Sequence, residues 1–329
     1  AWFTYKTYKN GWGLKGMIST VVGHDASKKE NLEEFKVLLL GVSTDIDAKL
    51  TDTIIVASYN PNTQKATLLS IPRDTFTGKN KNRATASEKI NAIYNLTRDP
   101  EKTLKAVNDL TGLGIEYYVL VETQALIEIV DAIGNIEFNV PIDMDYDDPT
   151  QDLSIHLKAG LQKIDGDKAE QLLRFRHNND GTTYPSEYGE QDLGRMRTQR
   201  EFITEVAKQT LKLSNIFKLG ELLDIVEKNV QTNVDFEAIK DYLPYAVEFQ
   251  TENILTATLP GVSEKCNGVW LYVADEAETE KLIQELFYDR DIVQGEDTST
   301  EGENSTTSTD TETNTTNQNT TSSGTSNVS

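Results

Sequence analysis

Short apolar runs alternate with helical segments over most of this chain, and that alternation limits its fold more than any other feature. Residues 35–42 (FKVLLLGV) form a continuous apolar run of strand length, and residues 52–59 (DTIIVASY) form a second run rich in β-branched side chains. Helical segments separate the later strands. This order predicts the α/β class: a layered αβα sandwich around a central mixed β-sheet, in one domain with additional C-terminal helices and strands.

The individual elements are predicted from period, composition and stop signals. After the first two strands, we expect further strands at residues 65–71, 115–121, 136–140, 153–157, 254–259 and 269–273. Helices are expected at residues 87–97, 101–110, 124–133, from 166, from 192 to about 213, in two segments up to about 249, and at 276–288. The polar stretch MDYDDPTQD, residues 144–152, is interpreted as a connection.

The two ends of the chain differ in composition from the part between them. Residues 297–329 are rich in Thr, Ser and Asn and contain no aromatic side chain, so they cannot bury enough apolar area to offset their ordering entropy. The first residues, AWFTYKTYKNGW, are aromatic and basic, which fits either a membrane-water interface or a helix docked on the core. We therefore predict an N-terminal segment at 1–32, one folded domain at 33–292 and a disordered tail at 293–329.

The charge balance excludes several classes of function. The formal net charge is −21, and a surplus of acids argues against nucleic acid as a partner. The single cysteine, Cys266, excludes an internal disulfide framework, and the three histidines are not at metal-ligand spacing. No apolar run reaches the length of a membrane span. Because the chain starts at Ala1 without Met, we expect a targeting or anchor segment upstream.

Arginine is concentrated in one part of the sequence. Five of the nine arginines fall within 27 residues: Arg174, Arg176, Arg195, Arg197 and Arg200. Planar, permanently charged guanidinium groups clustered in an acidic chain suggest a site for a phosphate or pyrophosphate. The alternative is an ion-paired helix surface. Arg195 and Gln199 are four residues apart on the predicted helix and can face one ligand, whereas Arg197 and Arg200 lie on another face, where ordinary surface charges are expected.

A second charged group is predicted where strands end. Asp52 opens a strand after a loop that carries Asp45 and Asp47, and Arg73 and Asp74 follow directly on another strand. Ligands of open α/β sheets bind at such ends, and carboxylates there suit Mg²⁺ shared with substrate phosphate oxygens. The alternative is structural: Asp52 caps its strand and Asp74 pairs with Arg73.

These pieces occur together in a known family. The segments that carry the resemblance are, in this order, LLLGVSTD, TDTIIVASYNPNTQKATLLSIPRDT, EKINAIYN, GIEYYVLVETQALIEIVDAIGNIEFNVP, and LLRFRH followed by DLGRMRTQREFI. Through these segments the chain resembles the LytR-CpsA-Psr family of bacterial cell-envelope proteins. The resemblance covers about residues 36–213. It implies a Gram-positive extracytoplasmic catalytic domain at 33–292, anchored in the membrane by an N-terminal helix. It also implies transfer of a glycopolymer, such as teichoic acid or capsular polysaccharide, from a polyprenyl-pyrophosphate carrier to peptidoglycan, with help from Mg²⁺.

The resemblance also implies roles for single residues. Asp52 matches a metal-associated aspartate, and Arg73 matches an arginine that contacts the pyrophosphate, with Asp74 as base or as a group that orients this arginine. The second phosphate-binding set comprises Arg174, Arg176, Arg195 and Gln199, with Asp192 holding the arginines and Lys89 on the carrier side. One departure is Ser43, where the family often has an acid, so that the second metal ligand is Asp45, Asp47 or absent.

The chemistry leaves alternatives open. Arginines and Mg²⁺ stabilise the negative charge that develops when a pyrophosphate bond breaks. The same residues would serve a pyrophosphatase or phosphodiesterase that uses water, or a polymer-binding regulator without catalysis. A lipid carrier also needs an apolar slot, which residues 119–130 or 211–226 could line, although core packing is the simpler interpretation of both segments.

Overall fold

The computed structural model describes residues 2–11, 13–23, 32–43, 49–212, 218–246 and 248–288. The predicted tail at 293–329 and both Asp45 and Asp47 lie outside these residues. None of the helices in the described ranges combines the length and the apolar character needed to cross a bilayer.

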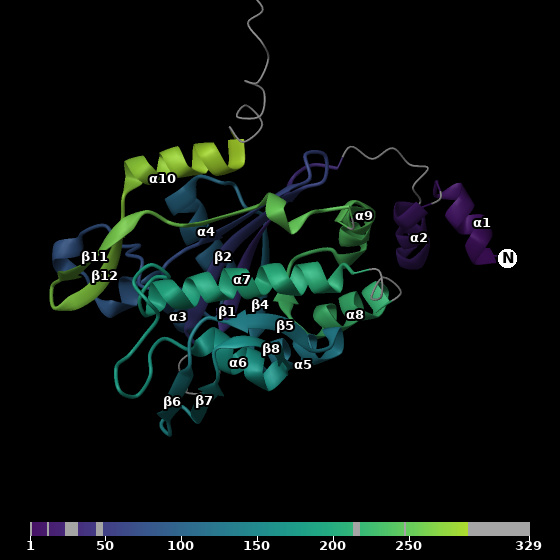
Figure 1. Cartoon of the computed structure of the whole chain (residues 1–329). Coiled ribbons are helices and arrows are strands. Elements are labelled where there is room, and N and C mark those ends of the chain that lie inside the picture. Colours follow the sequence, from purple (N-terminus) through teal and green to yellow (C-terminus); the bar gives the residue numbers. More distant parts are fainter. Residues whose placement is uncertain are drawn as a thin grey trace, which may run out of the picture. The chain divides into compact units, whose positions relative to one another are not determined.

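A six-stranded mixed sheet forms the centre of the fold (Figure 1), as the sequence predicts. Its strands lie in the order β10, β3, β2, β1, β4, β9. Their bounds are Ile254–Thr258, Lys65–Ser70, Thr51–Asn60, Phe35–Val42, Tyr117–Glu122 and Gln231–Thr232. The β1–β2, β2–β3 and β4–β9 pairs are antiparallel, whereas β1–β4 and β10–β3 are parallel. The strands β1, β2 and β3 follow the apolar runs that define the pattern of the sequence.

One face of the sheet packs against α3 (Ile90–Thr97), α4 (Pro100–Thr111) and α10 (Glu276–Ile283). Alternate strand residues such as Leu38, Leu40 and Ile54 point to this side and are almost completely buried. The π-helical turn Gln284–Tyr288 continues α10 and adds Phe287 to the same core. Since side chains alternate across a strand, the residues between them face the opposite side of the sheet.

The other side carries α5 (Thr123–Ile133), α6 (Gly166–Arg174) and α7 (Asp192–Thr210), together with two antiparallel strand pairs. These are β5–β8 (Ile136–Val140 and Gly160–Ile164) and, between them in the chain, the hairpin β6–β7 (Met144–Asp148 and Leu153–Leu157). A second hydrophobic core, which includes Phe138, Phe175 and Phe202, joins the strand pairs to the helices. Helices thus cover both faces of the sheet, and the αβα prediction is confirmed (Figure 1).

The remaining elements lie at the two ends of the described chain. The N-terminal helices α1 (Trp2–Lys9) and α2 (Gly13–Val22) differ in packing. Helix α2 contacts α8 (Leu219–Asn229) and α9 (Phe236–Ala246), and Lys15 Nζ lies 3.4 Å from the centroid of the Tyr245 ring. In α1, Trp2, Tyr5 and Tyr8 are exposed. The aromatic and basic segment, residues 1–12, contains α1, which packs on α2, and its interfacial role stays a prediction. The hairpin β11–β12 (Gly261–Cys266 and Val269–Ala274) precedes α10.

Two local expectations were wrong. The polar stretch at 144–152 contains strand β6, which pairs with β7 although three of its five residues are Asp. The helix expected at 87–97 divides into a 3₁₀ turn, Ala86–Glu88, and α3, because Lys89 between them has an extended backbone.

Candidate functional site

A cavity of about 350 Å³ lies between the second face of the sheet and the helices α5, α6 and α7. The residues of helix α7 that line the cavity change from polar to apolar along the helix. Arg195 and Gln199 line one end of the cavity, and Ile203 and Val206 line the part beyond them. At a rise of about 1.5 Å per residue, the helix spans roughly 16 Å from Arg195 to Val206. The cavity therefore has a cationic end and an apolar end.

The sheet and α5 continue this division. Leu39 and Val121 point into the cavity because they alternate with the residues that face the first core. Helix α5 adds Leu126 and Ile129. At the strand ends, Ser43 and Asp52 bring polar groups to the wall. The apolar slot considered for residues 119–130 therefore exists, whereas residues 211–226 contribute nothing to this lining within the described ranges.

The hairpin register brings Asp52 to Arg73. Ile55 pairs with Ser70 in the antiparallel β2–β3 ladder, and continuing this register by three residues sets position 52 opposite position 73. Arg73 Nη1 donates to Asp52 Oδ1 at 2.5 Å, and Ser43 Oγ donates to Asp52 Oδ2 at 3.3 Å. The close partner of Arg73 is thus Asp52 and not Asp74, which was the structural alternative.

Asp192, in the first turn of α7, lies among three arginines. Its Oδ1 is 2.5 Å from Arg195 Nη2, 3.4 Å from Arg176 Nε and 3.8 Å from Arg73 Nε. Gly194 permits this turn to pack closely, since a Cβ there would lie 2.2 Å from both Gly189 O and Tyr184 Cδ2. One carboxylate thus holds together side chains from three separate segments.

The cluster combines three arginines with two aspartates, so it has one positive charge in excess. The Nε atoms of Arg73, Arg176 and Arg195, and also Asp192 Oδ1, are buried without a hydrogen bond in the described part of the chain, although Asp192 Oδ1 lies within ion-pair distance of all three arginines. Arg195 is only 4% exposed and also donates to the Asp52 carbonyl oxygen at 3.3 Å. A buried charge without full compensation is costly, so this end of the cavity is built to accept an anion.

The pKa shifts show that Asp52 and Arg73 are well paired, whereas Arg195 is less fully compensated. Burial raises the pKa of Asp52, but the charges of Arg73 and Arg195 outweigh it and hold this pKa below the usual value of 3.8. Burial lowers the pKa of Arg195, only partly opposed by Asp192. Burial also lowers the pKa of Arg73, but Asp52 and Asp192 reverse the shift and raise it. Asp52 is therefore ionised at neutral pH.

The other predicted residues divide into two groups. Arg174 and Gln199 line the cavity: Arg174 Nη1 contacts Glu170 Oε1 at 2.8 Å, and Gln199 Nε2 donates to the Leu173 carbonyl oxygen at 3.0 Å. Lys89 and Asp74 pair with each other at 2.9 Å, and neither lines the cavity. The structure thus groups Lys89 with Asp74 beside the cluster instead of with Gln199.

Several lining residues escaped sequence reasoning. Glu122 and Glu170 line the cavity, where they pair with Lys49 and Arg174. Each of these two glutamates is an isolated acid in the sequence, and no motif marks it as part of a site. Arg200 also differs from the expected surface charge, since it is half-buried and donates to Ser70 Oγ at 2.7 Å and Thr258 Oγ1 at 3.2 Å. Arg197 behaves as expected, because it is exposed and pairs with Glu201.

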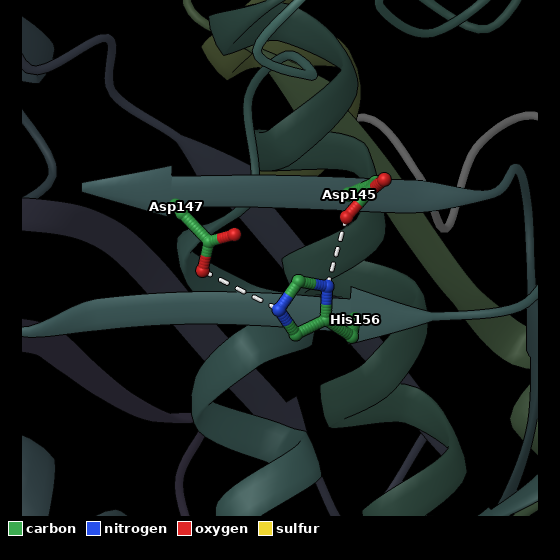
Figure 2. Close-up of side chains that lie close together, drawn as sticks. All are labelled: Asp145, Asp147 and His156. Carbon is green, nitrogen blue, oxygen red and sulfur yellow. Dashed lines mark hydrogen bonds and ion pairs between the residues drawn. The ribbon is translucent and has the colours of Figure 1, made fainter.

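A second group of potential ligands lies on the β6–β7 hairpin (Figure 2). His156 stands between two carboxylates, with Nδ1 2.8 Å from Asp145 Oδ1 and Nε2 3.3 Å from Asp147 Oδ1. All three side chains are more than half exposed, and both ring nitrogens already face an acid. This geometry describes a surface ion-pair group, and we assign no ligand to it.

Comparisons with known proteins agree with this architecture. The model of the LytR_cpsA_psr family matches residues 8–287. The polyisoprenyl-teichoic acid–peptidoglycan teichoic acid transferase TagU of Oceanobacillus iheyensis is 30% identical over 259 residues, which cover 76% of this chain and 74% of the relative. TagU of Bacillus subtilis is 29% identical, with 80% and 82% covered. The crystal structure of B. subtilis TagV shares the fold, with a TM-score of 0.64, 23% identity, and 78% and 98% covered.

Proposed function

The chain belongs to the LytR_cpsA_psr family, and from this we propose that it transfers a glycopolymer from a polyprenyl-pyrophosphate carrier onto peptidoglycan through a phosphodiester link. The observation that carries the proposal is one cavity with an arginine cluster at one end and an apolar wall beyond it. A polyprenyl pyrophosphate has the same division, with a diphosphate attached to a hydrocarbon chain. Two relatives named as teichoic acid transferases support a polymer of the teichoic acid class.

The reaction joins an acceptor hydroxyl to the phosphorus that carries the glycan. The oxygen of the hydroxyl forms a bond to this phosphorus, and the bond to the bridging oxygen breaks. Polyprenyl phosphate leaves with the electron pair, and the acceptor proton is released. Negative charge grows on the bridging and non-bridging oxygens, so preorganised donors close to them lower the barrier.

Arg73, Arg176 and Arg195 are the donors in this proposal. Their guanidinium groups gather around Asp192 and are therefore positioned before the diphosphate arrives. Arg195 is the most buried of the three, so water screens its charge least. Asp192 acts as a positioning residue, because its contacts are with arginines.

The residues at the strand ends fit Mg²⁺ through their donor chemistry. Asp52 supplies a carboxylate and Ser43 a hydroxyl, both hard oxygen ligands, on the wall that the diphosphate would reach. Asp45, expected as the second acid, lies outside the described residues. When bound, Mg²⁺ would neutralise charge on the diphosphate oxygens.

The location of the reaction follows from its substrates. Peptidoglycan lies outside the cytoplasmic membrane, and a polyprenyl carrier stays in that membrane. We therefore propose an extracytoplasmic enzyme held at the membrane by an N-terminal anchor. The exposed aromatic residues of α1 and its two lysines, Lys6 and Lys9, suit the water interface of such a membrane.

The test uses a polyprenyl-pyrophosphate-linked glycopolymer, Mg²⁺ and a peptidoglycan oligomer, with mass spectrometry of the products. We expect polyprenyl phosphate to be released and the glycan to appear on the oligomer. Release without joining would replace the transferase with a hydrolase. No release, with the lipid still bound, would reduce the protein to a carrier-binding regulator.

A further inference from the structure

A second and larger hollow, of about 830 Å³, lies on the opposite side of α7. Arg195, Gln199 and Phe202 face the first cavity, whereas Arg200, Thr204 and Lys208 face the second. A helix turns by about 100° per residue, so one helix forms a wall of both. The opposite walls of this second hollow, called here the α7 groove, are the β5–β8 strand pair and the edge strand β10.

The α7 groove combines apolar surface with paired charges. Leu161 of β8 is 75% exposed, and Ile254 of β10 is half-buried. Among the charges of α7 in the groove, Arg197 pairs with Glu201 at 2.8 Å, and Lys208 pairs with Glu205 at 3.4 Å. Sugar rings have apolar faces and a rim of hydroxyls, so a surface of this composition suits a glycan.

Arg200 differs from the other charges of the groove. Its Nη1 donates to two hydroxyls, those of Ser70 and Thr258, and no carboxylate lies within ion-pair distance in the part of the chain that the structure describes. Burial lowers its pKa. The guanidinium is thus held in place by neutral partners, and Glu201 attracts its charge without forming an ion pair, so an anionic group in the groove can pair with it directly.

The groove also lies close to the reacting centre. Ser70, which fixes Arg200, ends strand β3, and Arg73 follows three residues later. A chain segment of three residues spans at most about 11 Å. The residue that fixes Arg200 is therefore within this distance of Arg73, which lies at the cationic end of the first cavity.

We propose that the α7 groove binds the acceptor glycan strand of peptidoglycan, with Arg200 as the anchor for one of its carboxylates. This inference rests on the function proposed above. Three carboxylates, those of Glu137, Glu201 and Glu205, line the same groove. Against them stand Arg197, Arg200, Lys208 and Lys212, so the groove has one cation in excess, which matches a strand with widely spaced carboxylates better than a polymer with a phosphate on every repeat.

The first test measures binding without catalysis. Uncrosslinked peptidoglycan strands of defined length and a teichoic acid fragment of matched length are titrated calorimetrically into the whole chain. We expect Arg200→Met to weaken binding of the peptidoglycan strand about tenfold or more, since a charge-assisted hydrogen bond is lost. Arg83→Met is the matched control, because Arg83 is exposed on a 3₁₀ turn and does not line either hollow.

A second variant guards against a folding defect at Arg200. Lys208→Glu changes a side chain that is 50% exposed, and Lys105→Glu reverses a comparable helix-surface lysine of α4, which pairs with Asp109. We expect Lys208→Glu, and not Lys105→Glu, to raise KM for the acceptor several-fold while kcat and binding of the carrier lipid stay unchanged.

The outcomes separate this inference from the proposed function. Unchanged strand binding in both groove variants would overturn the inference and leave the transferase intact. Tighter binding of the teichoic acid fragment than of the peptidoglycan strand would overturn the choice of the peptidoglycan strand as the ligand of the groove. Strand binding that depends on Arg200 in a protein without transfer activity would support the groove and contradict the transferase.

Discussion

The arginine cluster at the end of the cavity and the Asp145, Asp147 and His156 group on the β6–β7 hairpin are both compact charged clusters, but they differ in burial and in balance. At the cavity, Arg195 is 4% exposed and three guanidinium Nε atoms have no hydrogen-bond partner among the described residues. On the hairpin, each imidazole nitrogen faces a carboxylate in solvent. The difference teaches that unsatisfied charge in a place of low dielectric, beside an apolar wall, marks a ligand site more clearly than the number of charges.

The largest effect should come from the cavity cluster. Arg73→Ala removes a donor that would face the diphosphate and also the partner of Asp52. We expect kcat for glycan transfer to fall about 100- to 1,000-fold, the usual cost of one preorganised donor. Steady-state kinetics with the lipid-linked donor measures this, and circular dichroism checks the fold. A folded variant with more than half of the original turnover would contradict the site.

The next effect concerns the apolar end. Ile203→Trp would fill part of the space between α7 and the sheet, because Ile203 lines the cavity. We expect KM for a long-chain carrier to rise about tenfold, since the filled volume displaces several methylene groups. A short-chain donor should be affected much less. Leu96→Trp, at a position of α3 that is 62% exposed, is the control; equal changes for both chain lengths would argue against a lipid slot.

A smaller effect should appear in the acid range of stability. Since the pKa of Asp52 is lowered in the folded chain, its ionised form stabilises the fold above about pH 4, and this contribution disappears as the pH falls through the lowered pKa. Asp52→Asn should reduce Tm at pH 7, and the difference from the original chain should shrink below pH 4. Thermal unfolding from pH 2.5 to 7 measures it. A difference that is constant with pH would show that the ionised carboxylate is not the cause.

The smallest effect is expected on the hairpin. His156→Ala removes two exposed contacts with carboxylates, which contribute little because water screens them. We expect unchanged transfer kinetics and a shift in Tm of no more than about 3 °C. If this variant instead lost activity to the degree of Arg73→Ala, the distinction between the two clusters would fail.

Sequence patterns predicted the sheet better than the site. Strands β1, β2 and β3 follow from short apolar runs of strand length. Strand β6 was missed because its acids hide the period of two, and backbone pairing with β7 decides its conformation. The contact of Asp52 with Arg73 could have been obtained from the hairpin register, since both residues continue the β2–β3 ladder.

The cavity itself could not be predicted, for a physical reason. Leu126 and Val206 have the helical spacing of a packed core, and only the distance between α5, α7 and the sheet leaves a space in front of them. The structural position of Arg200 was also hidden. Its partners, Ser70 and Thr258, are 130 and 58 residues away in sequence, and they approach only when β3 and β10 pair.

Helix α7 has a consequence for how the sequence can vary. Its two sides line two hollows with different chemistry. Which side a given residue faces depends on how many residues separate it from Arg195. Inserting or deleting one residue between Arg195 and Val206 would turn everything downstream by about 100° and present charged side chains to the apolar space. The length of this helix is therefore fixed, and natural insertions should be confined to the segments before Asp192 and after Thr210.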